Sequence, residues 1–191
     1  NAFARKSVTA PLAFKIQSAL VPELPKPHPL YEIFVYHAAV EGVHLRGGKV
    51  ARGGIRWSDR VADYRTEVLG LMKTQQTKNA LIVPVGSKGG FVLKKAPCDL
   101  SDLGSCDRSV LQQAVKDAYK TYISTLLSVT DNIVEGAITA PTDVRRYDED
   151  DPYFVVAADK GTATFSDTAN SISEDRNFWL KDAFASGGSQ G

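Results

Sequence analysis

Runs of branched and aromatic residues alternate along this chain with stretches of helical period. Residues 30–40, "LYEIFVYHAAV", are typical of a strand, and so are residues 153–158, "YFVVAA". Steps of three and four between inward-facing positions over residues 61–78 predict a helix, and a second helix is expected over residues 108–129. Strands that alternate with helices indicate an α/β protein. We expect a three-layer α/β/α domain on a mixed, mostly parallel sheet.

A proline-rich segment, "VPELPKPHP" (residues 21–29), separates the start of the chain from the rest, because proline fixes φ and lacks a backbone N–H. The preceding "PLAFKIQSAL" (residues 11–20) is interpreted as a short helix. We therefore expect residues 1–29 to be an N-terminal segment and connector, and residues 30–184 to be the domain itself. Residues 185–191, "ASGGSQG", are expected to be a flexible tail.

Composition narrows the class of function. With 43% hydrophobic and 24% charged residues, the chain resembles an ordinary globular protein, and its net charge of +1 argues against a nucleic-acid-binding protein. Charge is nevertheless uneven: residues 45–95 hold 11 Lys or Arg against 3 acidic residues, and residues 143–175 hold 9 acidic against 3 basic. A locally basic segment in a neutral protein suits a small anionic ligand.

Cys98 and Cys106 lie in a polar stretch at a spacing that matches no zinc-site or CxxC pattern. We therefore expect reduced thiols in a cytoplasmic protein, and no metal site. The sequence shows no apolar run of membrane-spanning length and no signal-peptide pattern, so no membrane association is expected.

The helical stripe within residues 61–78 begins with apolar and aromatic side chains and ends with Gln75 and Lys78. A charge that faces the interior is costly unless it has a partner. Lys78 therefore either points into a cleft or extends past the end of the helix to water. Periodicity alone leaves both alternatives open.

Two further ionisable residues stand beside predicted strands. The segment "GSKGG" (residues 86–90), interpreted as a turn before a strand resumed by "FVLKK" (residues 91–95), places Lys88 just after the apolar run "LIVPV" (residues 81–85), and Asp159 follows "YFVVAA". Ligands of open α/β sheets bind at the carboxyl ends of strands. We therefore predict that Lys88, Asp159 and Lys78 converge on one crevice.

Other interpretations of these residues are available. A P-loop lysine follows the glycines and opens a helix, whereas Lys88 precedes a glycine pair, so a P-loop is disfavoured. Lys88 alone could be a solvated turn lysine, and Asp159 alone could be a helix N-cap. The chain contains no G-x-G-x-x-G segment and hence no dinucleotide-binding fingerprint.

Three segments resemble the substrate domain of the glutamate dehydrogenases, in particular the large NAD-specific class of bacteria. They are "RGGIRW" (residues 52–57), "QQTKNALIVPVGSKGG" (residues 75–90) and "VVAADKGTATFSDTAN" (residues 155–170). The segments occur in the order and spacing of that family, and the similarity is strong over residues 50–93 and 150–188. The resemblance implies the fold of the amino-acid dehydrogenase substrate domain.

The resemblance also implies roles for individual residues. Lys88 matches the catalytic lysine, and Asp159 matches the carboxylate that transfers protons. Lys78 matches the lysine that binds the substrate α-carboxylate, with Gln75 one turn earlier. Arg52 stands where the family has a lysine for the side-chain carboxylate, and an arginine can hold a carboxylate through two hydrogen bonds.

The implied activity is the oxidation of L-glutamate to 2-oxoglutarate and ammonium, with hydride transfer to NAD⁺. The glycines Gly53, Gly54, Gly89 and Gly90 would let the backbone approach the substrate closely. NAD would be bound mainly by a nucleotide domain beyond Gly191, so we expect this chain alone to be inactive. The full-length protein is expected to be a homo-oligomer.

Two other functions are consistent with the sequence. One is a related dehydrogenase that acts on an apolar amino acid, against which Arg52 argues because an apolar pocket has no use for a cation. The other is a non-catalytic domain for anion binding or assembly, in which the same lysines recognise a regulatory anion.

Overall fold

The computed structural model describes residues 9–78 and 85–189, without the side chain of Lys78. Its strands are β1 (Leu12–Gln17), β2 (Tyr31–Tyr36), β3 (Val40–Arg46), β4 (Arg52–Trp57), β5 (Ser87–Leu93), β6 (Asn132–Val134), β7 (Ala137–Thr139), β8 (Val155–Ala158) and β9 (Ala185–Ser186). Its helices are α1 (Tyr64–Lys78), α2 (Arg108–Leu127) and α3 (Ser166–Asp175), with 3₁₀ turns η2 (Ser18–Leu20), η3 (Leu103–Ser105) and η4 (Lys181–Ala183). The strand predicted for "LIVPV" lies, apart from Val85, outside the described residues.

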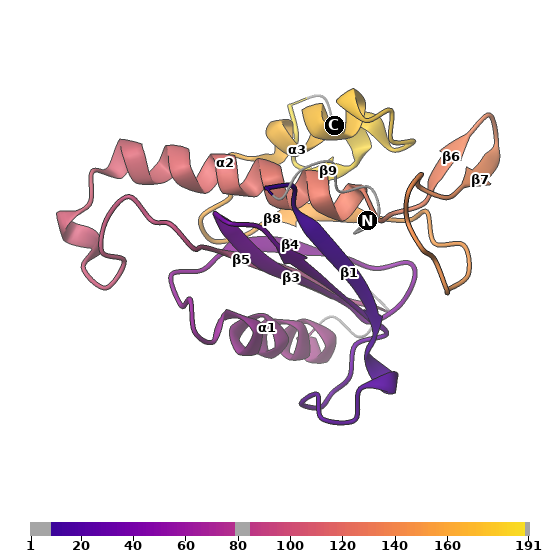
Figure 1. Cartoon of the computed structure of the whole chain (residues 1–191), viewed down its shortest axis with the longest axis horizontal. Coiled ribbons are helices and arrows are strands. Elements are labelled where there is room, and N and C mark those ends of the chain that lie inside the picture. The colour runs from indigo at the N-terminus through magenta and orange to yellow at the C-terminus, as the bar shows by residue number, and fades with distance from the viewer. Residues whose placement is uncertain (1–8, 79–84, 190–191) are drawn as a thin grey trace.

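One seven-stranded sheet, in the order β1-β2-β3-β5-β4-β8-β9, forms the middle of the molecule. The pairs β1-β2, β2-β3 and β3-β5 are antiparallel, and the pairs β5-β4, β4-β8 and β8-β9 are parallel. Helix α1 covers one face of this sheet, and α2 with α3 covers the other (Figure 1). The expected three-layer α/β/α arrangement on a mixed sheet is confirmed. The sheet is not mostly parallel as expected, since three of its six strand pairs are antiparallel and the parallel pairs are confined to the half from β5 to β9.

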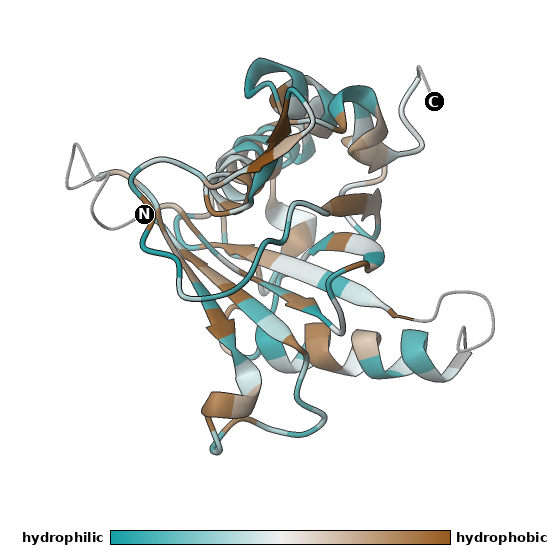
Figure 2. Ribbon diagram, turned by 90° about the vertical axis from the view of Figure 1, so that its right-hand side faces the viewer, coloured by the Kyte–Doolittle hydropathy of each residue, from teal (hydrophilic) through white to brown (hydrophobic). Residues whose placement is uncertain are grey.

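The core lies on both faces of the sheet, because successive residues of a strand point to opposite sides. Figure 2 shows hydrophobic residues distributed over the strands of the sheet. The side beneath α2 holds large buried rings: Phe91, Tyr122, Phe154 and Phe184. The side beneath α1 holds a smaller cluster: Val43, Leu45, Tyr64, Val68, Leu69, Met72 and Val92. Since full burial of one such side chain contributes about 1.5–3 kcal/mol, both layers of helices are held firmly to the sheet.

Both predicted long helices are confirmed, with slightly shorter spans. Helix α1 begins at Tyr64 rather than at residue 61, since Val61 lies half-exposed in the turns that precede it. Helix α2 ends at Leu127 rather than at residue 129. No helix in the described part of the chain is long and apolar enough to cross a membrane.

The helix predicted over residues 11–20 is wrong, because Leu12–Gln17 forms the edge strand β1. This segment contains good helix formers, but β1 pairs along its whole length with β2, with Phe14 opposite Phe34. Pairing with a neighbouring strand overrides local propensity here. Likewise Ala185–Ser186, expected to belong to a flexible tail, forms β9 beside β8.

The interpretation of residues 86–90 as a turn is also wrong, because the strand expected from Phe91 already begins at Ser87, and "SKGGFVL" is the central strand β5. Glycine normally weakens a strand interior unless something approaches it closely. A Cβ on Gly89 would lie 2.5 Å from Ile55 Cδ1, and a Cβ on Gly90 would lie 2.4 Å from Val68 Cγ2. These two glycines therefore make room for neighbouring protein side chains.

Cys98 and Cys106 form a disulfide, so the prediction of reduced thiols is wrong. The loop between them folds back through η3, which brings their Cα atoms to 5.6 Å, within the range that a disulfide requires. The spacing of the two cysteines matched no short motif, and only the return of the loop places them together.

Candidate active site

Lys88 and Asp159 form the centre of the candidate site. The Lys88 Nζ donates a hydrogen bond to Asp159 Oδ2 at 3.0 Å, and both side chains are largely buried, with 19% and 15% of their surface exposed. Asp159 directly follows β8, as predicted. Lys88 lies at the start of β5 rather than beyond the end of a strand, which corrects its predicted position. The strands are staggered, so that the start of β5 lies level with the end of β8.

Gly54 explains how Lys88 reaches Asp159. Strand β4 runs between β5 and β8. Gly54 of β4 lies between Lys88 of β5 and the end of β8, so the Lys88 side chain must pass over it to reach Asp159. A Cβ on Gly54 would lie 3.0 Å from Asp159 Cβ and 3.2 Å from Asp159 Oδ2. Because Gly54 has no side chain, the lysine and the carboxylate can meet over the middle strand.

A second cation holds the other oxygen of the same carboxylate. Arg56 donates from one guanidinium nitrogen to Asp159 Oδ1 at 3.1 Å, and from the other to Glu67 Oε1 at 2.9 Å. Glu67, in the first turn of α1, also accepts a hydrogen bond of 2.6 Å from Ser58 Oγ. A continuous chain of charges thus runs from Lys88 to the start of α1.

The backbone around Asp159 is fixed by local hydrogen bonds. The Lys160 amide donates to Asp159 Oδ1 at 2.7 Å, and the Asp159 amide donates to Thr162 Oγ1 at 3.1 Å. The Thr162 hydroxyl in turn donates to Ile55 O at 2.6 Å, which ties this turn to β4. Helix α3 begins at Ser166 with Phe165 at its N-cap position, so the interpretation of Asp159 as a helix N-cap is wrong.

The carboxylates of this site are stabilised in their charged form. Burial opposes ionisation of Asp159, but the Lys160 amide, Lys88 and Arg56 outweigh that effect and hold its pKa below the usual value of 3.8. Burial likewise opposes ionisation of Glu67, and the hydrogen bonds from Ser58 and Arg56 hold its pKa below 4.5. Asp159 is therefore a carboxylate at neutral pH.

The structure describes the side chains of two of the three predicted substrate-binding residues of α1 and β4, Gln75 and Arg52. The Gln75 Nε2 donates to Arg52 O at 3.0 Å, so the end of α1 is tied to the start of β4. The Gln75 Oε1 is buried and has no hydrogen-bond partner among residues 9–78 and 85–189. Arg52 is exposed to solvent. Lys78 is the last residue of α1, and its side chain lies outside the described part of the structure.

Gly53 allows two strands of the sheet to approach each other closely and does not border an open space. A Cβ on Gly53 would lie 1.5 Å from Ser87 O, so β4 and β5 approach each other too closely there for any side chain. Gly89 and Gly90 face the side chains described above. Of the four glycines predicted to make room for a substrate, Gly54 is the one that borders Asp159.

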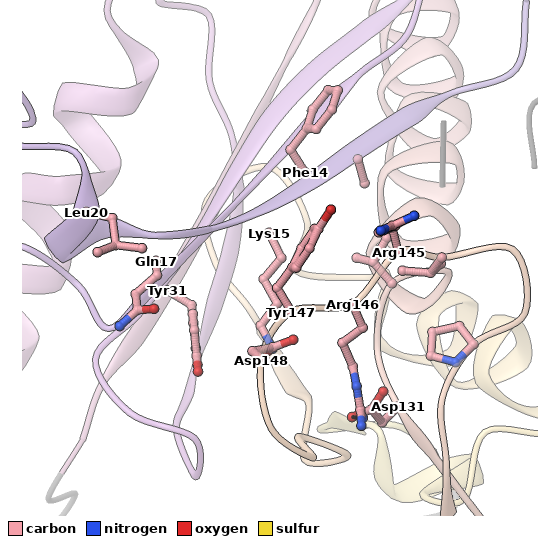
Figure 3. Close-up of a pocket in the computed structure, with 14 residues that line it drawn as sticks. Phe14, Lys15, Gln17, Leu20, Tyr31, Asp131, Arg145, Arg146, Tyr147 and Asp148 are labelled. Atoms are coloured by element: carbon pink, nitrogen blue, oxygen red, sulfur yellow. Dashed lines mark hydrogen bonds and ion pairs between the residues drawn. The ribbon is translucent and has the colours of Figure 1, made fainter. Parts of the chain in front are cut away.

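A separate cavity of about 520 Å³ lies on another part of the molecule, between β1 and residues 141–148 (Figure 3). Its lining includes Phe14, Tyr31 and Tyr147 but none of the predicted site residues. Within the described ranges, no group of three or more His, Cys, Asp or Glu side chains could hold a metal ion.

The family described as "Bacterial NAD-glutamate dehydrogenase, catalytic domain" matches residues 1–191, the whole of this chain. The chain belongs to this family. Its curated relatives named "NAD-specific glutamate dehydrogenase" include proteins of Pseudomonas aeruginosa, 61% identical over 179 residues, Halomonas elongata, 59% over 180, and Mycobacterium tuberculosis, 57% over 182. These alignments cover 94% of this chain and 11% of each relative, so the chain spans a small part of their length.

Membership of the bacterial NAD-glutamate dehydrogenase family confirms the resemblance drawn from the three sequence segments. Sequence reasoning missed Arg56, Glu67 and Ser58 at the site. One signal could have found Arg56: in a strand, alternate residues share a face, so Gly54 and Arg56 of "RGGIRW" point to the same side. Glu67 and Ser58 offered no such signal, because their contacts depend on how α1 lies on the sheet.

Proposed function

We propose that this chain is the substrate-binding and catalytic-lysine domain of an NAD-dependent glutamate dehydrogenase, which converts L-glutamate to 2-oxoglutarate and ammonium. The observation that carries the proposal is the contact between Lys88 Nζ and Asp159 Oδ2, an amine and a carboxylate paired at 3.0 Å within a chain of this family. Such a pair can move protons to and from a substrate that lies within hydrogen-bond reach of both.

The two residues would divide the work. Asp159, ionised at neutral pH, accepts a proton from the substrate ammonium, so that the nitrogen lone pair assists departure of hydride from the α-carbon. The Lys88 amine takes a proton from the water molecule that attacks the resulting iminium carbon. The protonated Asp159 then returns its proton to the departing nitrogen, which leaves as ammonia and takes up a proton from solvent.

NAD would be held mainly by other parts of the protein. The chain lacks a G-x-G-x-x-G segment, and the Cβ positions of Gly89 and Gly90 are occupied by Ile55 and Val68 rather than left open for a phosphate. When bound, NAD⁺ supplies the hydride acceptor. On this proposal the chain alone does not turn over, and the domain built on the seven-stranded sheet acts together with a nucleotide domain.

Arg52, Gln75 and Lys78 are proposed to bind the substrate. Gln75 lies beside Arg52, which is the arrangement required if the end of α1 and the start of β4 share one ligand. We propose that Arg52 holds the side-chain carboxylate and Lys78 the α-carboxylate. The unpartnered Gln75 Oε1 would accept a hydrogen bond from the substrate ammonium.

The test is a comparison of amino-acid substrates in the full-length protein. We expect NAD⁺ reduction with glutamate and little with leucine, and we expect Arg52→Met to raise the KM for glutamate at least tenfold with a smaller change in kcat. Equal activity on leucine would favour the apolar amino-acid dehydrogenases instead. An unchanged KM in Arg52→Met would remove Arg52 from the substrate pocket.

A further inference from the structure

Arg56 occupies an unusual position behind the candidate catalytic pair. It does not bond to Lys88, but its guanidinium joins two carboxylates, Asp159 on one side and Glu67 on the other. All three side chains are less than one-fifth exposed. A salt bridge this far removed from water is costly unless its remaining polar atoms find partners. Ser58 and the Lys160 amide supply such partners for the two carboxylates, whereas the Arg56 Nε is buried without a partner among the described residues.

The geometry requires an arginine. The Arg56 NH1 and NH2 groups each serve a different carboxylate, and the planar guanidinium fixes the angle between the two hydrogen bonds. A lysine presents a single compact charge and cannot reproduce that fixed fork. Arg56 therefore does more than neutralise charge: it sets the orientation of the Asp159 carboxyl relative to α1.

We propose that Arg56 is a positioning residue that keeps Asp159 ionised and directs its second oxygen toward Lys88, while Glu67 and Ser58 anchor the guanidinium. This inference rests on the proposed function, because it assigns Arg56 a part in the proton transfer by Asp159. The effect of Arg56 on the pKa of Asp159, which it lowers together with the Lys160 amide and Lys88, agrees with that part.

Few charged groups compete with Arg56 for this role. Among the described residues, those that bond directly to the Asp159 carboxyl are Lys88 from β5, Arg56 from β4 and the backbone amide of Lys160. Glu67 of α1 acts through Arg56. A cation at 4–6 Å lowers the pKa of an aspartate by about 1–3 units, so loss of Arg56 should be measurable even though Lys88 stays.

The experiment is the pH dependence of kcat/KM for glutamate in the full-length enzyme. In Arg56→Met we expect the midpoint of the acidic limb to rise by about one unit or more, with much of the lost rate recovered at higher pH. In Arg56→Lys we expect a smaller shift together with a lower kcat, because charge is kept and orientation is lost.

Arg65→Met is the matched control. Arg65 belongs to α1 and forms two hydrogen bonds of 2.7 and 2.6 Å with the buried Glu32 of β2, far from Asp159 in the sheet order. Its replacement breaks an ion pair of similar burial, so we expect lower stability with an unshifted pH profile. A profile for Arg56→Met that superimposes on that of the wild type would overturn the inference.

Glu67→Gln supplies a second test should Arg56→Met fail to fold. Removal of the negative charge of Glu67 leaves Asp159 as the sole anion on Arg56, so the acidic limb should move to lower pH, opposite to Arg56→Met. An unshifted or raised midpoint would contradict the inference. Failure of the proposed function looks different: Asp159→Asn would then keep its activity, whatever the Arg56 variants do.

Discussion

Lys88 Nζ lies 3.0 Å from Asp159 Oδ2 although 71 positions separate the two residues along the chain. The contact crosses strand β4, and it depends on a parallel half-sheet in which β5, β4 and β8 lie side by side. Neither local propensity nor any short motif requires this meeting. It is a product of the topology.

Gly54→Ala tests whether the space beside Gly54 is needed for the contact between Lys88 and Asp159. The added Cβ would lie 3.0 Å from Asp159 Cβ, tighter than an ordinary contact, and Asp159 must shift to relieve it. We expect kcat/KM of the full-length enzyme to fall by roughly 10–100-fold, since small misplacement of a catalytic group costs about that much.

Gly70→Ala is the control for Gly54→Ala. Gly70 lies within α1, and no described atom comes within 4 Å of a Cβ built there. Alanine favours a helix interior over glycine by about 0.5–1 kcal/mol, so this variant should unfold at higher urea concentration and keep its activity. Equal activity in the two alanine variants would show that the gap at Gly54 is unimportant.

His44 makes the stability of the chain sensitive to acid. Its ring is buried against Phe154, and neither ring nitrogen has a hydrogen-bond partner among the described residues. Burial first, and the charge of Arg46 second, lower the pKa of His44 from 6.5 to about 3. Between about pH 6.5 and pH 3 the unfolded chain therefore binds a proton at His44 that the folded chain does not bind. The free energy of unfolding falls as the pH decreases through that window.

His44→Leu should remove this sensitivity. At 1.36 kcal/mol for each unit of pKa difference, His44 accounts for a loss on the order of 2–3 kcal/mol between about pH 7 and pH 4.5. Urea unfolding at both pH values measures it, with His37→Leu as the control for loss of a partly exposed histidine. Unchanged acid sensitivity in His44→Leu would mean that other groups are responsible.

The Cys98–Cys106 disulfide closes a short loop with a sequence separation of 8 between β5 and α2. A loop of this size stabilises the folded chain by about 2.5 kcal/mol at most in the chain-entropy model. We expect the double Cys→Ser variant to lose up to that amount in urea unfolding, and mass spectrometry of the unreduced protein to find neither thiol alkylated. Two alkylated thiols would contradict the pairing.

Much of the layered fold could be predicted from sequence, because hydrophobic period reports directly on local structure. The helix containing Val68 and the strand before Asp159 both follow from that signal. The strand β1 could not be found in this way, since its residues favour a helix and only pairing with β2 makes it a strand. The disulfide was missed because only the return of the loop through η3 brings Cys98 and Cys106 together.

Only the central pair of the candidate site was predictable. Lys88 and Asp159 were identified because each stands beside a predicted strand and matches a family motif. The supporting residues Arg56 and Glu67 were not, because they meet through the packing of α1 on the sheet. The glycines of β5 were misinterpreted as a turn, because the side chains that occupy the space beside them belong to other elements.

The most direct test of the central claim is the rate of NAD⁺ reduction by glutamate in the full-length enzyme carrying Lys88→Ala. Loss of a positioned acid–base group typically lowers the rate by about 10²–10⁴-fold. We predict a fall of this size in kcat, with the variant folded as judged by thermal unfolding. A folded Lys88→Ala enzyme that keeps the wild-type kcat would contradict the account, because the pair of Lys88 and Asp159 would then have no part in the chemistry.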